Sequence, residues 1–313
     1  MNPLTLSQTN QGYFINAHAR QFSPHTIKDY KNVLEHLQKF LKADFPMSEI
    51  STRHLEMFLA AQTHLKKKTA LNYHTALSAL WAWSAGEQLV QENIVRRIKP
   101  PKPEITLVIP YTVDEMKLML ANLDRVKLYT RPGQTWQDRK TMEPERARAI
   151  ILLLCDTGLR AEELCSIKIG HVDKRLMRIK VFGKGAKERY VNFSTRTAQA
   201  LWRYLATKQD HQKDSDYLFT VRQLHGGSGK LNRDRLLKML ITIGNRAGVK
   251  EVNVHRFRHF FAIQYLRNRG DVYTLQRLLG HSTLDMVKRC LAVVQTDVDS
   301  AYTLASPVGN LNL

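Results

Sequence analysis

Cysteine is scarce in this sequence. Its 313 residues include only Cys155, Cys165 and Cys290, at no spacing typical of metal ligands. An odd number of cysteines does not fit a framework of disulfides within one chain, the device that small secreted domains use. The cysteine content therefore favours a protein of a reducing compartment.

Long hydrophobic runs are also missing. The longest, from Ala149 to Cys155, is far shorter than the about 20 apolar residues that a membrane-spanning helix needs. The start of the chain, Met1-Asn2-Pro3-Leu4, lacks the basic and then apolar pattern of a secretion signal. We therefore expect a soluble, intracellular protein.

Acidic residues are few beside basic ones. The sequence has 28 Asp and Glu against 48 Lys and Arg, a net charge of +20, with an isoelectric point near 10.0. Such an excess indicates a polyanionic partner, most often nucleic acid, with an anionic membrane surface as the alternative. The length suggests two domains, and 43% hydrophobic residues supply material for both cores.

The first part of the chain, residues 1–98, predicts an all-α domain of about four or five short helices. Ser23 is a candidate N-cap with Pro24 in the first turn, and helical spacing recurs over 52–61 and 67–85, where Gly86 is expected to end the helix. Its basic residues are ordinary solvated surface if taken singly, but with the net charge they become candidate phosphate contacts. These candidate DNA contacts are Lys66, Lys67, Lys68, Arg96 and Arg97.

A proline-rich stretch follows, Lys99-Pro100-Pro101-Lys102-Pro103, and predicts a linker over 99–110. The second domain, 111–313, opens with a capping box of Thr112 and Glu115. A loop is expected over 124–142, and the expected helices are 144–156, 195–208, 231–247, 255–268 and 272–279.

Two strands at 177–182 and 189–193 predict a β-hairpin with Lys184 at its tip, and 217–221 is a possible further strand. The fold class is therefore mainly α with a small β-sheet. A phosphate-loop nucleotide site is excluded, because Leu231 follows Gly229-Lys230 and Gly185 follows Lys184 where that motif needs Ser or Thr.

The stretch from Val254 to Leu291 carries the strongest chemical signal. His255, Arg258 and His259 share one predicted helix, Leu279-Gly280-His281 follows at a turn, and Cys290 comes next. A guanidinium with imidazoles suits a phosphate, because Arg donates a planar two-point hydrogen bond. A metal site on His255 and His259 is disfavoured, since Arg256 stands where a zinc-protease motif needs Glu. Any single one of these His could equally cap a helix or pack in the core.

Arg160 and Glu163 form a second candidate, just past the helix that ends at Gly158. Three residues apart, they would meet if a helix starts there. Such a pair is either a surface ion pair of little energetic worth or a device by which Glu163 holds a phosphate-binding Arg in one rotamer.

Together these motifs resemble the tyrosine recombinases, also called phage integrases. Thr157-Gly158-Leu159-Arg160 with Glu163, the Gly-Lys-Gly hairpin, His255-x-x-Arg258-His259 and Leu279-Gly280-His281 occur in the family's order, over residues 111–295. The resemblance implies a helical core-binding domain, an α+β catalytic domain and a C-shaped clamp on double-stranded DNA. It also implies four protomers on two paired sites and strand exchange through a Holliday junction without metal, ATP or another cofactor.

The resemblance also assigns roles. Arg160 and Arg258 would clamp the scissile phosphate, and Lys184 would protonate the 5′-oxygen leaving group. His255 would assist proton transfer or donate a hydrogen bond to the phosphate. His281 would donate a further hydrogen bond to the phosphate, and Glu163 would support the Arg site. The origin implied is a prokaryote, a phage or a mobile element, and the location is the cytoplasm, at the nucleoid.

One departure is serious: Cys290 stands where the family has its nucleophilic tyrosine, nine residues after His281. Phe260 in place of Thr and Arg256 in place of Asp are tolerable departures. The nearest later tyrosine, Tyr302, is more than three helical turns away. A thiolate is soft and shorter in reach, so we expect a nucleophile variant, natural or engineered, that binds DNA but is catalytically impaired.

Two rival functions stay open at this point: a non-catalytic, sequence-specific DNA-binding or architectural protein of the same fold, and a metal-dependent nuclease, which lacks a carboxylate cluster here. The apolar segment after Cys290 is expected to be a helix that docks on a neighbouring protomer and ends in a polar tail. The expected assembly is a monomer in solution and a homotetramer on DNA. The motifs do not specify the target sequence or an accessory directionality factor.

Overall fold

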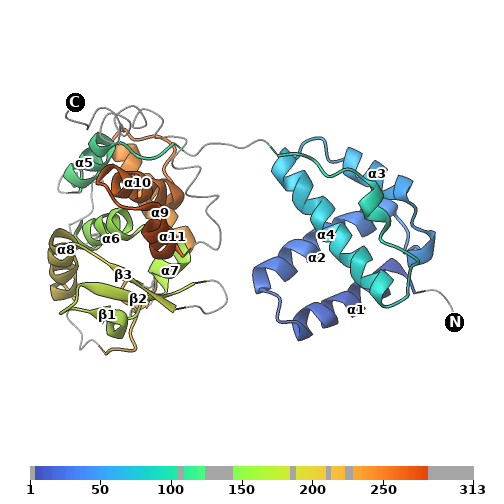
Figure 1. Cartoon of the computed structure of the whole chain (residues 1–313), viewed down its shortest axis with the longest axis horizontal. Helices are drawn as coiled ribbons and strands as arrows, with labels where there is room; N and C mark the ends of the chain where they lie inside the picture. The colour runs from blue at the N-terminus through green and yellow to red at the C-terminus, as the bar shows by residue number, and fades with distance from the viewer. Residues whose placement is uncertain are drawn as a thin grey trace, which may run out of the picture. The chain divides into compact units, whose positions relative to one another are not determined.

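A computed structural model describes residues 4–103, 109–123, 144–183, 188–208, 213–222 and 228–280 of the chain. The chain divides into two compact units, Met1–Thr106 and Leu107–Leu313 (Figure 1). The predicted fold class is confirmed, because helices dominate and the sheets are small and antiparallel. The bounds of the predicted linker, 99–110, stay a prediction. None of the described helices combines the length and the apolar character needed to cross a membrane.

The first unit is helical. Its elements are α1 (Leu6–Ala19), α2 (Pro24–Leu41), η1 (Met47–Glu49), α3 (Thr52–Ala60), α4 (Lys67–Gly86) and η2 (Ile94–Arg97). The start of α2 is as predicted: Ser23 Oγ accepts a hydrogen bond from the backbone N–H of Thr26 at 3.1 Å, and Pro24 lies in the first turn. Leu34, Leu77 and Trp81 are in its core.

Two details of this unit differ from the sequence prediction. Helix α1 was not predicted, because its buried face mixes Thr9 and Asn10 with Leu6 and Tyr13, and the polar pair interrupts the apolar period. Gly86 is the last helical residue of α4 rather than a residue beyond it, and Glu87 is the C-cap.

The second unit is α+β. Its helices are α5 (Val113–Ala121), α6 (Pro144–Thr157), α7 (Ala161–Cys165), η3 (Ile169–His171), α8 (Thr195–Ala206), α9 (Arg233–Arg246), α10 (Val254–Arg267) and α11 (Val272–Leu279). Its strands are β1 (Val172–Asp173), β2 (Arg178–Phe182), β3 (Glu188–Asn192), β4 (Thr220–Arg222) and β5 (Ser228–Lys230). The predicted helices and the hairpin are confirmed within a few residues. The loop expected over 124–142 lies outside the described residues.

The strands form two sheets, one in the order β1-β2-β3 and the other of β4 and β5, both antiparallel. The strand predicted over 217–221 is displaced: Tyr217 makes only an isolated bridge with Lys168, and β4 begins at Thr220. Strands β1 and β5 were not predicted, since two or three residues are too short to show alternation.

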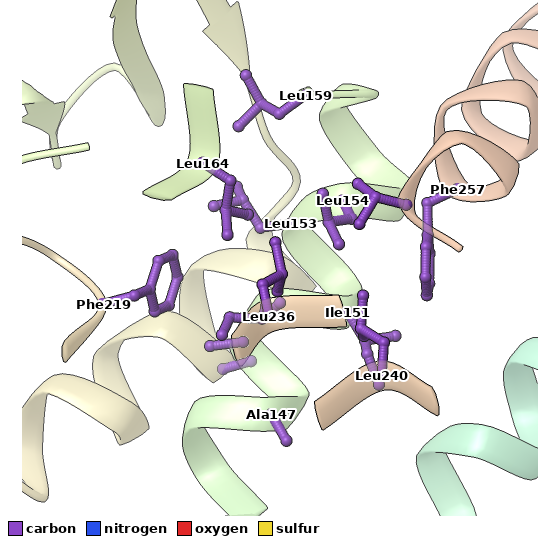
Figure 2. Close-up of a cluster of buried hydrophobic side chains, with 14 of the residues drawn as sticks. Ala147, Ile151, Leu153, Leu154, Leu159, Leu164, Phe219, Leu236, Leu240 and Phe257 are labelled. Atoms are coloured by element: carbon purple, nitrogen blue, oxygen red, sulfur yellow. The ribbon is translucent and has the colours of Figure 1, made fainter. Parts of the chain in front are cut away.

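Helix α6 is the centre of the second core. Figure 2 shows its Ile151 and Leu154 among Leu236 and Leu240 of α9 and Phe257 of α10, all of them buried. Helix α6 also packs on α8. A helix covered on several sides must be apolar around most of its circumference, which explains the run of apolar residues in the sequence. This packing places the end of α6 beside α10.

Candidate active site

A sharp turn at Gly158 joins α6 to α7 and presents Arg160. Gly158 has a φ of +60°, and a Cβ there would lie 2.6 Å from Phe261 Cδ1 and 2.9 Å from Leu279 Cδ2. Both the left-handed backbone and the close approach of α10 and α11 therefore require glycine. Arg160 follows as the N-cap of α7.

Arg160 and Glu163 are in contact, as their spacing predicted. Arg160 Nη1 donates to Glu163 Oε1 at 2.9 Å, and the backbone N–H of Arg160 donates to Oε2 at 2.9 Å. The Glu163 side chain is buried, whereas Arg160 is partly exposed. The pair is therefore not an exposed surface ion pair, and the carboxylate holds the arginine through both its main chain and its side chain.

Arg189 of β3 is a residue that sequence reasoning missed. Its Nη1 and Nη2 donate to the two oxygens of Glu163 at 2.8 and 2.9 Å, and its Nε donates to the Leu278 carbonyl at 2.9 Å. The signal was present: Arg189 lies two residues before buried Val191, so a strand places both on the inward face. A charged residue at an inward position needs a buried partner, and Glu163 is that partner.

The electrostatics keep Glu163 ionised. Burial alone would raise the pKa of the Glu163 carboxyl, but the hydrogen bonds from Arg189 and from the Arg160 backbone, with the charges of both guanidiniums, outweigh it and lower the pKa to about 2. One carboxylate thus faces two arginines, and the cluster keeps a net positive charge that suits an anion.

Arg258 approaches the same turn from α10. Its Nη1 donates to the Gly158 carbonyl at 2.7 Å and its Nη2 to the Leu279 carbonyl at 2.6 Å, and the residue is buried. These carbonyls lie at the C-terminal ends of α6 and α11, where the helix dipole favours a cation. Arg258 therefore connects two helix ends within the site.

His255 lies one turn before Arg258 on α10. Partial loss of water around its ring lowers the pKa of His255, and the charges of Arg258, Arg160 and Arg233 lower it further. These surroundings favour the uncharged imidazole, the form that can accept a proton. Arg233, the first residue of α9, is a second basic neighbour that the sequence prediction did not include.

Arg256 has a structural role that its position in the motif did not indicate. It is buried, its Nη2 contacts Glu115 at 3.1 Å, and its guanidinium lies 4.1 Å from the centre of the Tyr111 ring. Its Nε and Nη1 donate to the carbonyls of Ile109 and Lys250 at 2.9 and 2.6 Å. Arg256 therefore fixes the start of α10 to the segment that enters the second unit.

The structure thus brings together Arg160, Glu163, His255 and Arg258 and adds Arg189 to them. Lys184, His281 and Cys290 lie outside the described residues. In the part of the chain that is described, no three His, Cys, Asp or Glu side chains are grouped so as to hold a metal ion.

The candidate DNA contacts of the first unit are exposed. Lys66 is the N-cap of α4, and Lys67 and Lys68 lie in its first turn, which has no acidic residue. The helix dipole favours negative charge at this end, so the three lysines do not stabilise the start of α4. Arg96 and Arg97 are exposed on η2, and Arg97 pairs with Glu92.

Comparisons with known proteins agree with this arrangement. Tyrosine recombinase XerC of Staphylococcus saprophyticus is 28% identical over 293 residues, which cover 92% of this chain and 93% of that protein. XerC of Anoxybacillus flavithermus is 27% identical over 299 residues, covering 92% and 93%.

Solved structures share the fold. An integrase of the Tn1549 transposon, in complex with a circular intermediate DNA, has a TM-score of 0.70 at 15% identity and covers 94% of this chain and 99% of its own. A lambda integrase tetramer bound to a Holliday junction has a TM-score of 0.69 at 16% identity, covering 91% and 79%. XerH bound to a palindromic difH substrate has a TM-score of 0.68 at 22% identity, covering 96% and 85%.

The family patterns themselves cover both units. That of the phage integrase N-terminal SAM-like domain matches residues 15–88, and that of the phage integrase family matches residues 115–295. The second match spans more than half of the chain and contains Arg160, Glu163, Arg189, His255 and Arg258, so the chain belongs to the phage integrase family.

Proposed function

We propose that this protein is a site-specific DNA recombinase whose nucleophile position is altered. The observation that carries the proposal is the meeting of Arg160, Arg258 and His255 around the turn at Gly158. Two guanidiniums beside a proton acceptor suit a phosphodiester whose nonbridging oxygens gain charge in the transition state.

The reaction proposed for the unaltered site is a phosphoryl transfer. The nucleophile's oxygen bonds to phosphorus while the bond from phosphorus to the 5′ oxygen breaks. The nucleophile's proton passes to His255, and Lys184 gives a proton to the departing 5′ oxygen. Arg160 and Arg258 bind the nonbridging oxygens, and His281 donates a further hydrogen bond. Attack of a 5′ hydroxyl from the second duplex reverses the step. The first pair of exchanges forms a Holliday junction, and a second pair resolves it.

Cys290 at the nucleophile position predicts impaired chemistry. A sulfur nucleophile is a poor match for a hard phosphorus centre, and the thiol reaches less far than a phenol. We therefore expect DNA binding and synapsis without measurable recombination. A non-catalytic DNA-binding protein is the second candidate, and the cysteine itself favours it.

The proposed partner is double-stranded DNA with paired sites. The net charge of +20 and the exposed lysines at the start of α4 support it. By likeness to the lambda integrase tetramer on a Holliday junction, we propose a homotetramer on DNA, formed from monomers through the segment after Cys290. Truncation at Asp297 should leave single-site binding intact and remove the paired complex.

The decisive experiment compares the unchanged chain with Cys290→Tyr. A duplex that the unchanged chain binds is first selected from a random-sequence library. The affinity of the protein for this duplex should fall steeply as the salt concentration rises, because bound phosphates release counterions. A nicked version of that duplex then traps the covalent protein–DNA adduct. Adduct in the Cys290→Tyr variant alone supports the proposal, whereas good binding with no adduct in either protein favours the non-catalytic candidate.

A further inference from the structure

We infer that Arg189 is a positioning residue that aligns the three separate segments of the site. This inference rests on the proposed function. The three guanidinium nitrogens of Arg189 all donate within the protein, Nη1 and Nη2 to Glu163 and Nε to the Leu278 carbonyl. Its effect on the chemistry would therefore pass through the groups that it holds.

The first segment is the start of α7. Arg189 occupies both oxygens of Glu163, and Glu163 in turn accepts from the side chain and the backbone of Arg160. Because both carboxylate oxygens are fixed on the Arg189 side, the carboxylate cannot rotate without breaking two charge-assisted hydrogen bonds. The direction of the Arg160 guanidinium is thereby tied to Arg189.

The second segment is the turn after α11. The bond to Leu278 is followed within two residues by Gly280, whose φ is +64°. A Cβ at Gly280 would lie 3.1 Å from Arg189 Nη1, closer than most side-chain contacts. Glycine at this position thus permits the guanidinium to lie against the turn, and the next residue in the sequence is His281.

The third segment is the hairpin. Arg189 belongs to β3, opposite Val181 of β2, and the five residues between the two strands, 183–187, include Lys184 in the sequence. The same guanidinium therefore links the strand after Lys184, the helix after Arg160 and the turn before His281. Arg258 makes a comparable connection between Gly158 and Leu279, so the turn after α11 is held from two sides.

Arginine is required for this geometry. A lysine amine keeps the charge but is a single point, so it cannot serve both Glu163 oxygens and the Leu278 carbonyl from one planar group. Arg189→Lys is therefore the informative variant, because it changes the alignment of the site with little change in charge or volume.

The matched control is Arg178→Lys. Arg178 lies on β2 of the same hairpin, pairs with Asp173 at 3.3 Å and lies 4.4 Å from the centre of the Tyr190 ring. It stands on the opposite face of the hairpin from Arg189, so its loss tests the sheet without touching Glu163.

Both substitutions are made in the Cys290→Tyr variant and tested on the selected, nicked duplex. We expect Arg189→Lys to leave DNA affinity within about threefold and to slow the rate constant of adduct formation at saturating protein by about 100-fold, the effect of a misplacement near 1 Å. The final fraction of DNA trapped should stay the same. Arg178→Lys should match the parent in rate, affinity and final fraction.

A purely structural role would give a different result. It would lower the final trapped fraction, because fewer molecules are folded, and leave the rate constant of the folded molecules unchanged. That pattern, or equal rates for Arg189→Lys and its parent, overturns the inference. If the Cys290→Tyr parent itself forms no adduct, the proposed function fails first, and the inference falls with it.

Discussion

Two arginine–carboxylate clusters of the second unit are built in opposite senses. In the site cluster, Arg160, Glu163 and Arg189, the carboxylate is enclosed: the Glu163 side chain is 5% exposed, and that of Arg160 is 37% exposed. In the anchor cluster, Tyr111, Glu115 and Arg256, the arginine is enclosed at 9%, while Glu115 is 25% exposed.

The difference in exposure indicates which residue of each pair is enclosed by the protein and which is open to a ligand. A buried carboxylate with a partly exposed guanidinium presents positive charge to a ligand. A guanidinium covered by carbonyls and an aromatic ring uses its donors on the protein itself. We propose that the same residue types serve chemistry in the site cluster and architecture in the anchor cluster.

The largest expected effect follows from Glu163→Gln. Two arginines would lose a charged partner that is almost fully buried, and removal of one member of such a pair typically costs about 3–5 kcal/mol. Glu115→Gln removes a more exposed partner, and the expected loss is about 1 kcal/mol. Urea unfolding of both variants measures the two losses in the free energy of unfolding. Equal losses would contradict the contrast between the clusters.

The second expected effect separates activity from stability. In the Cys290→Tyr background, Arg160→Lys should slow adduct formation by about 10²–10³-fold, as for the loss of one transition-state donor, with a change in unfolding free energy below about 1 kcal/mol. Arg256→Lys should lower the free energy of unfolding and leave the rate of adduct formation unchanged, since the donors of Arg256 bind backbone carbonyls. Rates on the nicked duplex and urea unfolding are measured for both. A loss of activity alone in Arg256→Lys would break the comparison.

The sequence predicted the Arg160–Glu163 pair of the site cluster, but neither Arg189 nor the anchor cluster. Arg160 and Glu163 are three residues apart, so local helical geometry is enough to bring them together. Arg189 with Glu163 and Arg256 with Glu115 are joined across 26 and 141 positions, and periodicity carries no information on such contacts. Helix α6 was predictable because its burial leaves a long apolar run, and α1 was not, because polar Thr9 and Asn10 share its buried face.

Arg256 is a second case of the same limit. In the motif it is a tolerable replacement for Asp, and nothing nearby in the sequence indicates a partner. One acceptor, the Lys250 carbonyl, is only six residues away, but the Ile109 carbonyl and the Glu115 carboxylate are more than 140 positions away and come within reach only in the fold. Long-range polar contacts at a helix start are thus the part of the site that only the fold shows.

The third expected effect is a pH dependence of stability that belongs to Glu163. Its pKa falls from 4.5 to about 2 on folding, so the folded state favours the ionised form. The stabilisation is fully present above pH 4.5 and is lost as pH falls toward 2, with a size on the order of 3 kcal/mol. Asp173 and Asp271 also have lowered pKa values, so the test is the difference between the unchanged chain and Glu163→Gln. That difference should shrink below pH 4.5, and a constant difference would contradict the assignment.

The smallest expected effect concerns Tyr111 of the anchor cluster. Its hydroxyl donates to the Asn253 carbonyl at 3.2 Å and accepts from the Asn253 backbone N–H at 3.1 Å, and Asn253 is the N-cap of α10. Burial raises the pKa of Tyr111 to about 12, although the Asn253 hydrogen bond and Arg256 oppose the rise, so the phenol stays protonated.

Tyr111→Phe removes both hydrogen bonds and keeps the ring, which should cost about 1–2 kcal/mol in unfolding free energy. Tyr111→Leu also removes the contacts with Arg256 and with Phe257, whose ring centre lies 4.6 Å away, and should cost more. If the anchor cluster is architectural, both variants should form adduct at the parent's rate in the Cys290→Tyr background; a rate that falls with Tyr111→Phe would mean that the start of α10 is part of the chemistry after all.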